Sequence, residues 1–268
     1  MTGTGGAAAY PGRLLAFVMH ALRGLAGAPS QSRRIIARQR CMRNAGWLTI
    51  VGVVAVVVLM VTVDVPFIGA MPRRGDPALW PARILTDFGK SEYVLWTTGA
   101  LLVIVALMVP LTAGTRRARL AALDGHLAFI FLSVAFANVV GEALKDQFGR
   151  GRPFVGGAAN AFNFHPFSLH EPFASLPSAH STTAFALAFA VAAVWPRTRC
   201  VVAVYALTIA ATRLLLLAHH PSDVVAGAVV GIAVTMLVRY WFAVRGLGFA
   251  LGDDGRVAPL SGPSGLAG

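Results

Sequence analysis

Long runs of apolar residues, separated by short polar stretches, are the dominant pattern of this 268-residue chain. A helix needs about 20 apolar residues to cross the hydrocarbon core of a bilayer. Six runs come close to that length, at residues 45–64, 93–112, 126–144, 178–196, 199–218 and 221–242. The pattern therefore predicts an all-α fold, a polytopic membrane bundle of six transmembrane helices.

The composition agrees with a membrane location. Hydrophobic residues make up 56% of the chain and charged residues 13%, and the mean hydropathy is +0.68. A soluble domain would carry about 25% charged residues. The net charge of +12 would suggest a nucleic-acid partner in a soluble protein. Here most arginines flank the apolar runs, where they meet lipid headgroups, so we expect the bilayer and no nucleic acid as the partner. No obligate protein partner is evident.

The chain divides into three predicted parts. Residues 1–44 form an N-terminal segment, of which residues 1–9 are rich in Gly and Ala and expected to be disordered. Residues 10–25 place apolar side chains at helical spacing but are too short and too basic to span. With no clean cleavage site after them, we prefer a surface-lying amphipathic helix to a signal peptide. Residues 45–245 form the transmembrane domain, and the Gly/Pro/Ser-rich residues 246–268 are predicted to be a flexible tail.

The basic residues orient this bundle. Fifteen of the 23 Lys and Arg residues fall on the side that carries both termini. Loops rich in Lys and Arg stay in the cytoplasm, so both termini are predicted to be cytoplasmic. Cys41 and Cys200 fall on that same side, and we expect them to be free thiols.

Three polar clusters interrupt the apolar C-terminal half of the chain. They are Lys145–Pro153 (KDQFGRGRP), Pro177–His180 (PSAH) and Thr212–Asp223. Charged side chains at membrane depth are costly unless they are paired or line a wet cavity. Cations that hold an anion, together with two histidines and a carboxylate, are what phosphoryl transfer through a covalent histidine requires. The topology above places all three clusters on the extracytoplasmic face.

Lys145 and Arg152 are the candidate phosphate ligands of the first cluster. Arginine offers a planar fork for two phosphate oxygens, and lysine offers a point charge. Either could instead be a cation that extends from a helix end to the headgroups. Arg150 is the weaker candidate, and we expect it to be solvated.

Ser178 and His180 begin an apolar helix in the second cluster. The free N–H groups and the positive dipole end of such a helix favour a bound anion. Ser178 could instead serve only as a helix N-cap.

Arg213, His219, His220 and Asp223 form the third cluster. A histidine nucleophile needs a carboxylate that fixes its tautomer and offsets its developing charge. Asp223 could supply that carboxylate, or could be an ordinary residue of a helix start. Spacing alone does not choose between His219 and His220 as its partner.

The order Lys-x6-Arg-Pro, Pro-Ser-x-His and Arg-x5-His-x3-Asp resembles the signature of the type-2 phosphatidic acid phosphatase superfamily. That superfamily also contains bacterial lipid phosphatases and the vanadium haloperoxidases. The motifs extend from Lys145 to Asp223. Ala179 stands where the family usually has Gly, and Thr212 where it usually has Ser.

The resemblance implies a role for each matching residue. His219 would be the nucleophile that forms a phosphohistidine, with Asp223 orienting it. His180 would protonate the leaving oxygen and then activate water. The phosphoryl oxygens would be held by Lys145, Arg152, Ser178, Ala179 and Arg213. No metal and no cofactor are implied, and the chain lacks the carboxylate cluster that a magnesium-dependent phosphatase needs.

We therefore expect a metal-independent phosphatase of a bacterial-type inner membrane, with its active site extracytoplasmic. Its substrate would be a lipid phosphate or pyrophosphate, of the phosphatidate, phosphatidylglycerophosphate or polyprenyl pyrophosphate class. Three alternatives stay open: a haloperoxidase, an intramembrane serine protease that uses Ser178, and a non-catalytic lipid-handling protein. Six spans argue against the haloperoxidase, and the cations beside Ser178 would have no role in a protease.

The predicted topology can be tested with reporter fusions. Fusions after residues 120, 198 and 250 should report the cytoplasm, because they follow the arginine-rich loops. Fusions near residues 75 and 165 should report the outside. A paired assay with alkaline phosphatase and green fluorescent protein measures both compartments, and reversed signals would place the three clusters in the cytoplasm.

Overall fold

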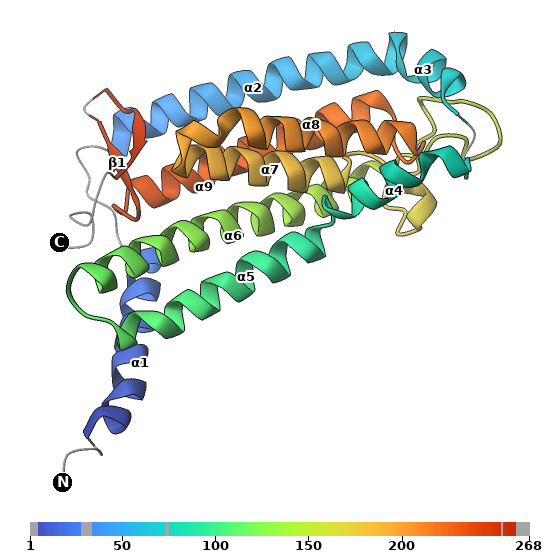
Figure 1. The fold of residues 1–268 in the computed structure, drawn as a ribbon. Helices are drawn as coiled ribbons and strands as arrows, with labels where there is room; N and C mark the ends of the chain where they lie inside the picture. The colour runs from blue at the N-terminus through green and yellow to red at the C-terminus, as the bar shows by residue number, and fades with distance from the viewer. Residues whose placement is uncertain (1–4, 28–33, 73–74, 253, 261–268) are drawn as a thin grey trace. The chain divides into compact units, whose positions relative to one another are not determined.

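The computed structural model describes residues 5–27, 34–72, 75–252 and 254–260. Most of these residues are helical (Figure 1). The helices are α1 (Gly5–Ala26), α2 (Arg34–Thr62), α3 (Asp64–Ala70), α4 (Trp80–Asp87), α5 (Ser91–Met108), α6 (Gly114–Phe148), α7 (Ala179–Val194), α8 (Arg199–Leu215) and α9 (Pro221–Ala243). Residues 1–9 were expected to be disordered, but residues 5–9 belong to α1, so that part of the prediction is wrong. Residues 1–4 lie outside the described residues, as do Arg33, Arg73 and Arg74 of the basic-residue count.

Five helical stretches among the described residues are long and apolar enough to cross a membrane. They are Ala37–Thr62, Pro77–Leu111, Gly114–Phe148, Pro196–Leu215 and Pro221–Ala243. The prediction of a polytopic α-helical membrane protein is therefore confirmed.

The predicted sixth span is shorter than expected. α7 has 16 residues, which corresponds to about 24 Å against a hydrocarbon core of about 30 Å. Its first turn is polar, and the 3₁₀ turn Pro196–Thr198 follows it directly, so neither end extends the helix. The count of six spans is thus not reached by length alone.

The chain forms two compact units. The first contains Met1–Met42, Trp96–Leu132 and Leu237–Gly268, and the second contains Arg43–Leu95 and Ser133–Met236. All three polar clusters belong to the second unit.

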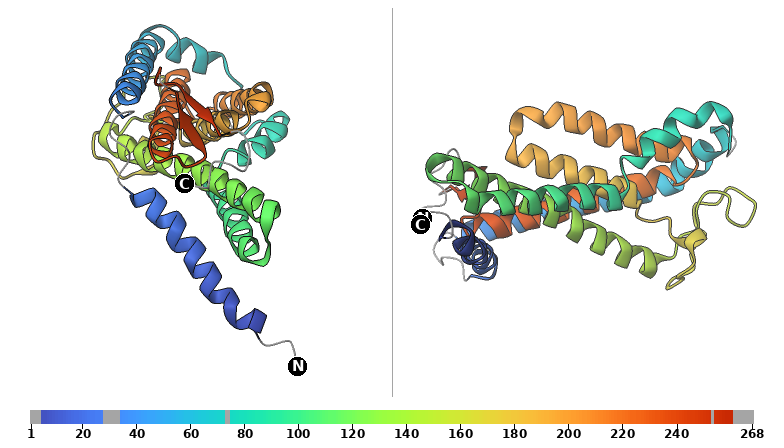
Figure 2. Two further views of the ribbon diagram at one scale, coloured as in Figure 1. Left: turned by 90° about the vertical axis from the view of Figure 1, so that its left-hand side faces the viewer. Right: turned by 60° about the horizontal axis from the view of Figure 1, so that its bottom comes forward.

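The second unit is built on closely packed small residues. α7 and α8 lie side by side in both views of Figure 2, and buried Ala184, Ala188, Ala206 and Ile209 fill the space between them. Alanines let two helix backbones approach closely, which is how helices pack where lipid offers no hydrophobic driving force. This packing holds the polar first turn of α7 and the last turn of α8 in fixed positions.

The first unit contains the N-terminal helix and a β-hairpin. The ring of Phe129 packs edge to face against two other rings. Its centroid lies 5.4 Å from that of Phe242 and 4.8 Å from that of Phe249. Strand β1 (Phe249–Leu251) pairs with β2 (Val257–Pro259). The described part of the predicted flexible tail is therefore folded, because Phe249 is fully buried in this aromatic cluster. The division into three domains itself stays a prediction.

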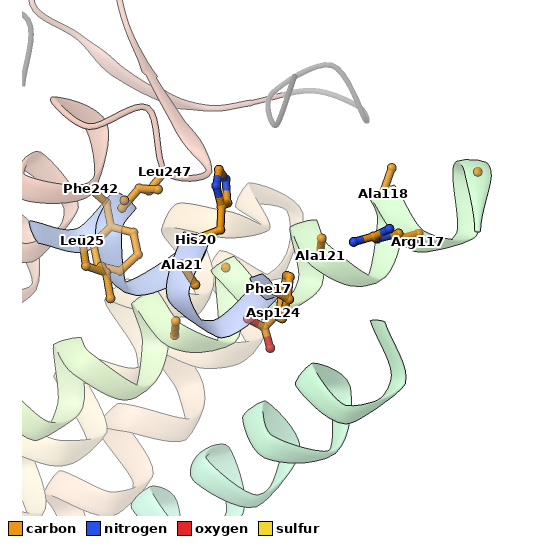
Figure 3. Close-up of a pocket in the computed structure, with 14 residues that line it drawn as sticks. Phe17, His20, Ala21, Leu25, Arg117, Ala118, Ala121, Asp124, Phe242 and Leu247 are labelled. Carbon is orange, nitrogen blue, oxygen red and sulfur yellow. The ribbon is translucent and has the colours of Figure 1, made fainter. Parts of the chain in front are cut away.

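The predicted amphipathic helix, residues 10–25, forms most of α1 (Gly5–Ala26). Its residues Phe17 and Leu25 face a cavity of about 390 Å³ that α6 and Phe242 also line (Figure 3). Leu15 and Leu22 are exposed on the same helix, which suits a helix that contacts lipid.

A glycine contact between α9 and α7 gives a stability test. A Cβ on Gly231 would lie 2.5 Å from the carbonyl oxygen of Thr182 and 2.9 Å from the backbone nitrogen of Ala186. Gly231→Ala should therefore lower the free energy of unfolding by about 1–3 kcal/mol, through overpacking. Gly46→Ala is the matched control, since its Cβ would meet nothing within 4 Å. Thermal denaturation in detergent measures both, and an unchanged midpoint for Gly231→Ala would contradict the close packing.

Candidate active site

The polar helix ends of the second unit converge on one site. Lys145 at the end of α6 and His180 in the first turn of α7 line the same pocket. Arg213 in the last turn of α8 and His219 both act electrostatically on His180. The structure thus brings the candidates from all three motifs together.

A glycine turn leads from α6 into the site. α6 ends at Phe148, and Gly149 follows with a φ of 55°, donating its N–H to the Lys145 carbonyl at 2.8 Å. A side chain at Gly149 would overlap the carbonyl of His165. Only glycine fits this left-handed position at a helix end.

Arg150, the next residue, is fully buried, so the expectation that it is solvated is wrong. Its guanidinium donates to Asp64 Oδ2 at 2.7 Å, Asp223 Oδ1 at 2.5 Å and Ser222 Oγ at 2.6 Å. It also donates to the Ala161 carbonyl at 3.0 and 2.7 Å. Two carboxylates and a carbonyl satisfy the cation, which explains why it lies inside.

Asp64 is a site residue that the sequence analysis missed. It begins α3, at the last position of the first apolar run, and is fully buried. Its Oδ1 accepts the Ser222 N–H at 3.0 Å, and its Oδ2 accepts the Ser222 hydroxyl at 2.5 Å. A carboxylate in this place stabilises the N-terminal end of α9. The signal that could have identified it is a lone Asp at membrane depth.

The two histidines of the third motif have different partners. His220 Nδ1 lies 3.1 Å from Asp223 Oδ2, whereas His219 Nδ1 lies 3.8 Å from it, beyond a good hydrogen bond. His219 Nδ1 instead donates to the Ser175 carbonyl at 2.9 Å. The Ser175 hydroxyl donates to Asp223 Oδ2 at 2.7 Å. Asp223 therefore contacts His220 directly and reaches His219 through Ser175, a residue outside the motifs.

The protonation of His219 follows from these contacts. A carbonyl oxygen only accepts, so the proton of the neutral ring lies on Nδ1, and Nε2 keeps its lone pair. Burial lowers the pKa of His219 to about 4, and the nearby charges of Arg213 and Arg152 act in the same direction, against the effect of Asp223. The imidazole is therefore neutral at physiological pH.

Arg152 and Arg213 each have a donor nitrogen without a hydrogen-bond partner among the described residues. Arg213 Nη1 donates to Thr86 Oγ1 at 2.7 Å, and Arg152 Nη2 lies 3.4 Å from Glu171 Oε1. The Nε of each arginine is buried and has no partner among the described residues. Buried donors are seldom left unsatisfied, so both nitrogens are candidates to bind a ligand oxygen.

Lys145 and the start of α7 are the other candidates for binding an anion. Lys145 Nζ pairs with Glu142 Oε1 at 2.7 Å. Ser178 is fully buried at the N-cap position, yet its side chain makes no capping bond. The first N–H groups of α7, from Ala179 onward, have no acceptor within the helix. The side chain of Ser178 therefore does not act as a cap, and the free N–H groups of this first turn could bind a phosphate.

Comparisons with known proteins identify the family of the chain. The model of the PAP2 superfamily matches residues 126–247. A lipid A 1-phosphatase of Rhizobium johnstonii is 36% identical over 208 residues, which cover 75% of this chain and 82% of that protein. A lipid A 1-phosphatase of Rhizobium etli is 39% identical over 128 residues, 48% of this chain and 55% of that protein.

Among solved structures, the chain resembles a transmembrane PAP2-type phosphatidylglycerolphosphate phosphatase from Bacillus subtilis. The TM-score is 0.45 at 18% sequence identity, over 72% of this chain and 93% of that chain.

The chain belongs to the PAP2 superfamily, so the resemblance drawn from the three motifs is confirmed. It is a multi-span membrane enzyme, a phosphatase that acts on lipid phosphates.

The buried ion pair of Arg150 gives a direct test. Asp64→Asn should lower the free energy of unfolding by about 3 kcal/mol, because Arg150 stays buried with one charged partner fewer. Thermal denaturation in detergent measures the loss, and phosphate release should fall in parallel. Asp146→Asn is the control, since Asp146 is an exposed carboxylate at the end of α6. If Asp64→Asn and the wild type have the same melting temperature, the contacts of Arg150 with Asp64 do not stabilise the site.

Proposed function

We propose that the chain removes a phosphate from a sugar-linked lipid phosphate of the lipid A 1-phosphate kind, through a phosphohistidine on His219. The substrate rests on the relatives, both of which are named lipid A 1-phosphatases. The chemistry rests on the hydrogen bond from His219 Nδ1 to the Ser175 carbonyl. That bond leaves the Nε2 lone pair available for attack.

The first step forms the phosphoenzyme. His219 Nε2 attacks phosphorus, an N–P bond forms, and the bond from phosphorus to the lipid oxygen breaks. His180 donates a proton to that oxygen, so the lipid leaves as a neutral alcohol. His180 is placed for this role by its position in the first turn of α7 and its unpartnered, buried Nε2.

The second step regenerates the enzyme. His180, now neutral, takes a proton from water while the water oxygen attacks phosphorus. The N–P bond breaks, inorganic phosphate leaves, and His219 is neutral again. In both steps the transition state carries negative charge on its three equatorial oxygens, and preorganised cations are the usual means of stabilising that charge.

The phosphate ligands are the groups with free donors. Arg152 and Arg213 each offer an unpartnered Nε, and Lys145 offers its ammonium group. The first N–H groups of α7, beside Ser178 and Ala179, offer a helix N-terminus. These groups carry enough positive charge for a phosphate monoester without a metal ion.

The proposed location is the inner membrane of a bacterium, with both termini in the cytoplasm. The distribution of Lys and Arg supports this orientation. The active site then opens at the headgroup level of the outer leaflet, where a lipid-linked phosphate is concentrated. A soluble phosphate would gain nothing from a site among apolar helices.

Trapping the phosphoenzyme tests the mechanism. Rapid quenching with radiolabelled lipid phosphate should leave acid-labile, base-stable label on the wild-type protein, as expected for a phosphohistidine. His219→Ala should carry no label and release no phosphate, because the attacking nitrogen is gone. His220→Ala is the matched control and should still be labelled. Label that persists in His219→Ala would show that another residue is the nucleophile.

A further inference from the structure

A polar pocket of about 450 Å³ adjoins His180. It is the pocket that Lys145, Ala179 and His180 line, and its other walls include Glu142 from the end of α6. Its far side is formed by Lys90, just before α5, and by Glu92 and Tyr93 in the first turn of α5. A volume of this size is typical of sites for small molecules or for one part of a larger ligand.

The side chains around the start of α5 differ in how far contacts within the protein occupy them. Lys90 is fixed by Asp87, with Nζ 2.8 Å from Oδ1, and its ammonium lies 5.4 Å from the centroid of the Tyr93 ring. Glu92 is exposed and forms no hydrogen bond or ion pair with any residue that the structure describes. The Tyr93 side chain is 53% exposed.

The position of the pocket determines which part of the substrate enters it. A general acid must lie within hydrogen-bond reach of the oxygen that it protonates. Because His180 is the proposed acid, the leaving oxygen lies beside it, and the group attached to that oxygen extends into the adjoining space. The pocket lined by His180, Glu92 and Tyr93 is such a space.

The chemistry of the walls favours a leaving group rich in hydroxyls. A free carboxylate such as Glu92 accepts hydrogen bonds from hydroxyl or amide N–H groups. The ring of Tyr93 offers an apolar face with a polar edge, which matches the alternating faces of a sugar ring. Diacylglycerol, the leaving group of phosphatidate, has no hydroxyl besides the leaving oxygen and offers Glu92 nothing to accept.

We propose that the part of this pocket lined by Glu92 and Tyr93, which we call the leaving-group pocket, is a subsite for the sugar ring that carries the scissile phosphate. Glu92 accepts hydrogen bonds from the ring substituents, and Tyr93 packs against its face. The inference rests on the proposed function, because it requires His180 to protonate the leaving oxygen. It adds the residues that select a glycolipid over a glycerolipid, and they lie outside the three motifs.

Two substrates that differ only in the leaving group test the subsite. A glucosamine-based lipid 1-phosphate and a phosphatidate with the same acyl chains are presented in the same detergent micelles to the purified full-length protein. Glu92→Gln and Tyr93→Leu should each lower kcat/KM on the glycolipid about tenfold, the usual effect of losing a hydrogen bond to a charged group or an aromatic contact. On phosphatidate both variants should stay within about twofold of wild type, since neither residue contacts the reacting atoms.

Asp146→Asn is the matched control, because Asp146 is an exposed carboxylate at the end of α6 that does not line the pocket. It should match the wild type on both substrates. A second measurement uses the phosphate-free glycolipid as an inhibitor, whose inhibition constant should rise about tenfold in Glu92→Gln.

Equal losses on the two substrates, or no loss on the glycolipid, would overturn the leaving-group pocket and leave the proposed function intact. A wild-type protein that hydrolyses phosphatidate but not the glycolipid would overturn the proposed substrate and the pocket with it. A wild-type protein that releases phosphate from neither would contradict the proposed function itself.

Discussion

The site depends on one buried guanidinium. Arg150 has no exposed surface, and removing a cation from water costs several kcal/mol unless its donors are satisfied. Asp64 and Asp223 satisfy them from two helices that are far apart in sequence, and the Ala161 carbonyl does so from the loop. Because none of these partners can move away without leaving a buried donor of Arg150 unsatisfied, α3, the loop that contains Ala161 and α9 are held in one arrangement.

The same residue connects this arrangement to the reacting histidine. The Arg150 carbonyl accepts the Ser175 N–H at 3.0 Å, while its guanidinium holds Asp223. Ser175 in turn bridges Asp223 and His219, through its hydroxyl and its carbonyl. The tautomer of His219 is thereby fixed before any substrate arrives. Fixing donors and acceptors in advance is the main way in which an enzyme lowers the barrier of a reaction that develops charge. In our proposal the hydrogen bonds of Arg150 fix the position of these donors and acceptors, and Arg150 itself does not contact the phosphate.

The helices and the motif residues could be predicted from the sequence, because both are local signals. Apolar runs of about 20 residues and fixed spacings within a motif are readable in one window. Asp64 could not be assigned in that way, because its partners Arg150 and Ser222 lie 86 and 158 residues away. Arg150 was expected in solvent for the same reason. The short α7 and the hairpin after α9 were missed because helix length and the burial of Phe249 depend on packing, not on composition.

The central claim is that a neutral histidine, held by Ser175 and backed by the Arg150 network, transfers phosphate from a lipid without a metal ion. The most direct measurement is phosphate release by the purified protein, in excess EDTA, from a panel of lipid A 1-phosphate, phosphatidate, phosphatidylglycerophosphate and polyprenyl pyrophosphate. Our account predicts turnover of lipid A 1-phosphate that EDTA leaves unchanged and that vanadate, a mimic of the pentacoordinate transition state, inhibits. Activity that disappears with EDTA and returns with magnesium, or no release from any member of the panel, would contradict it.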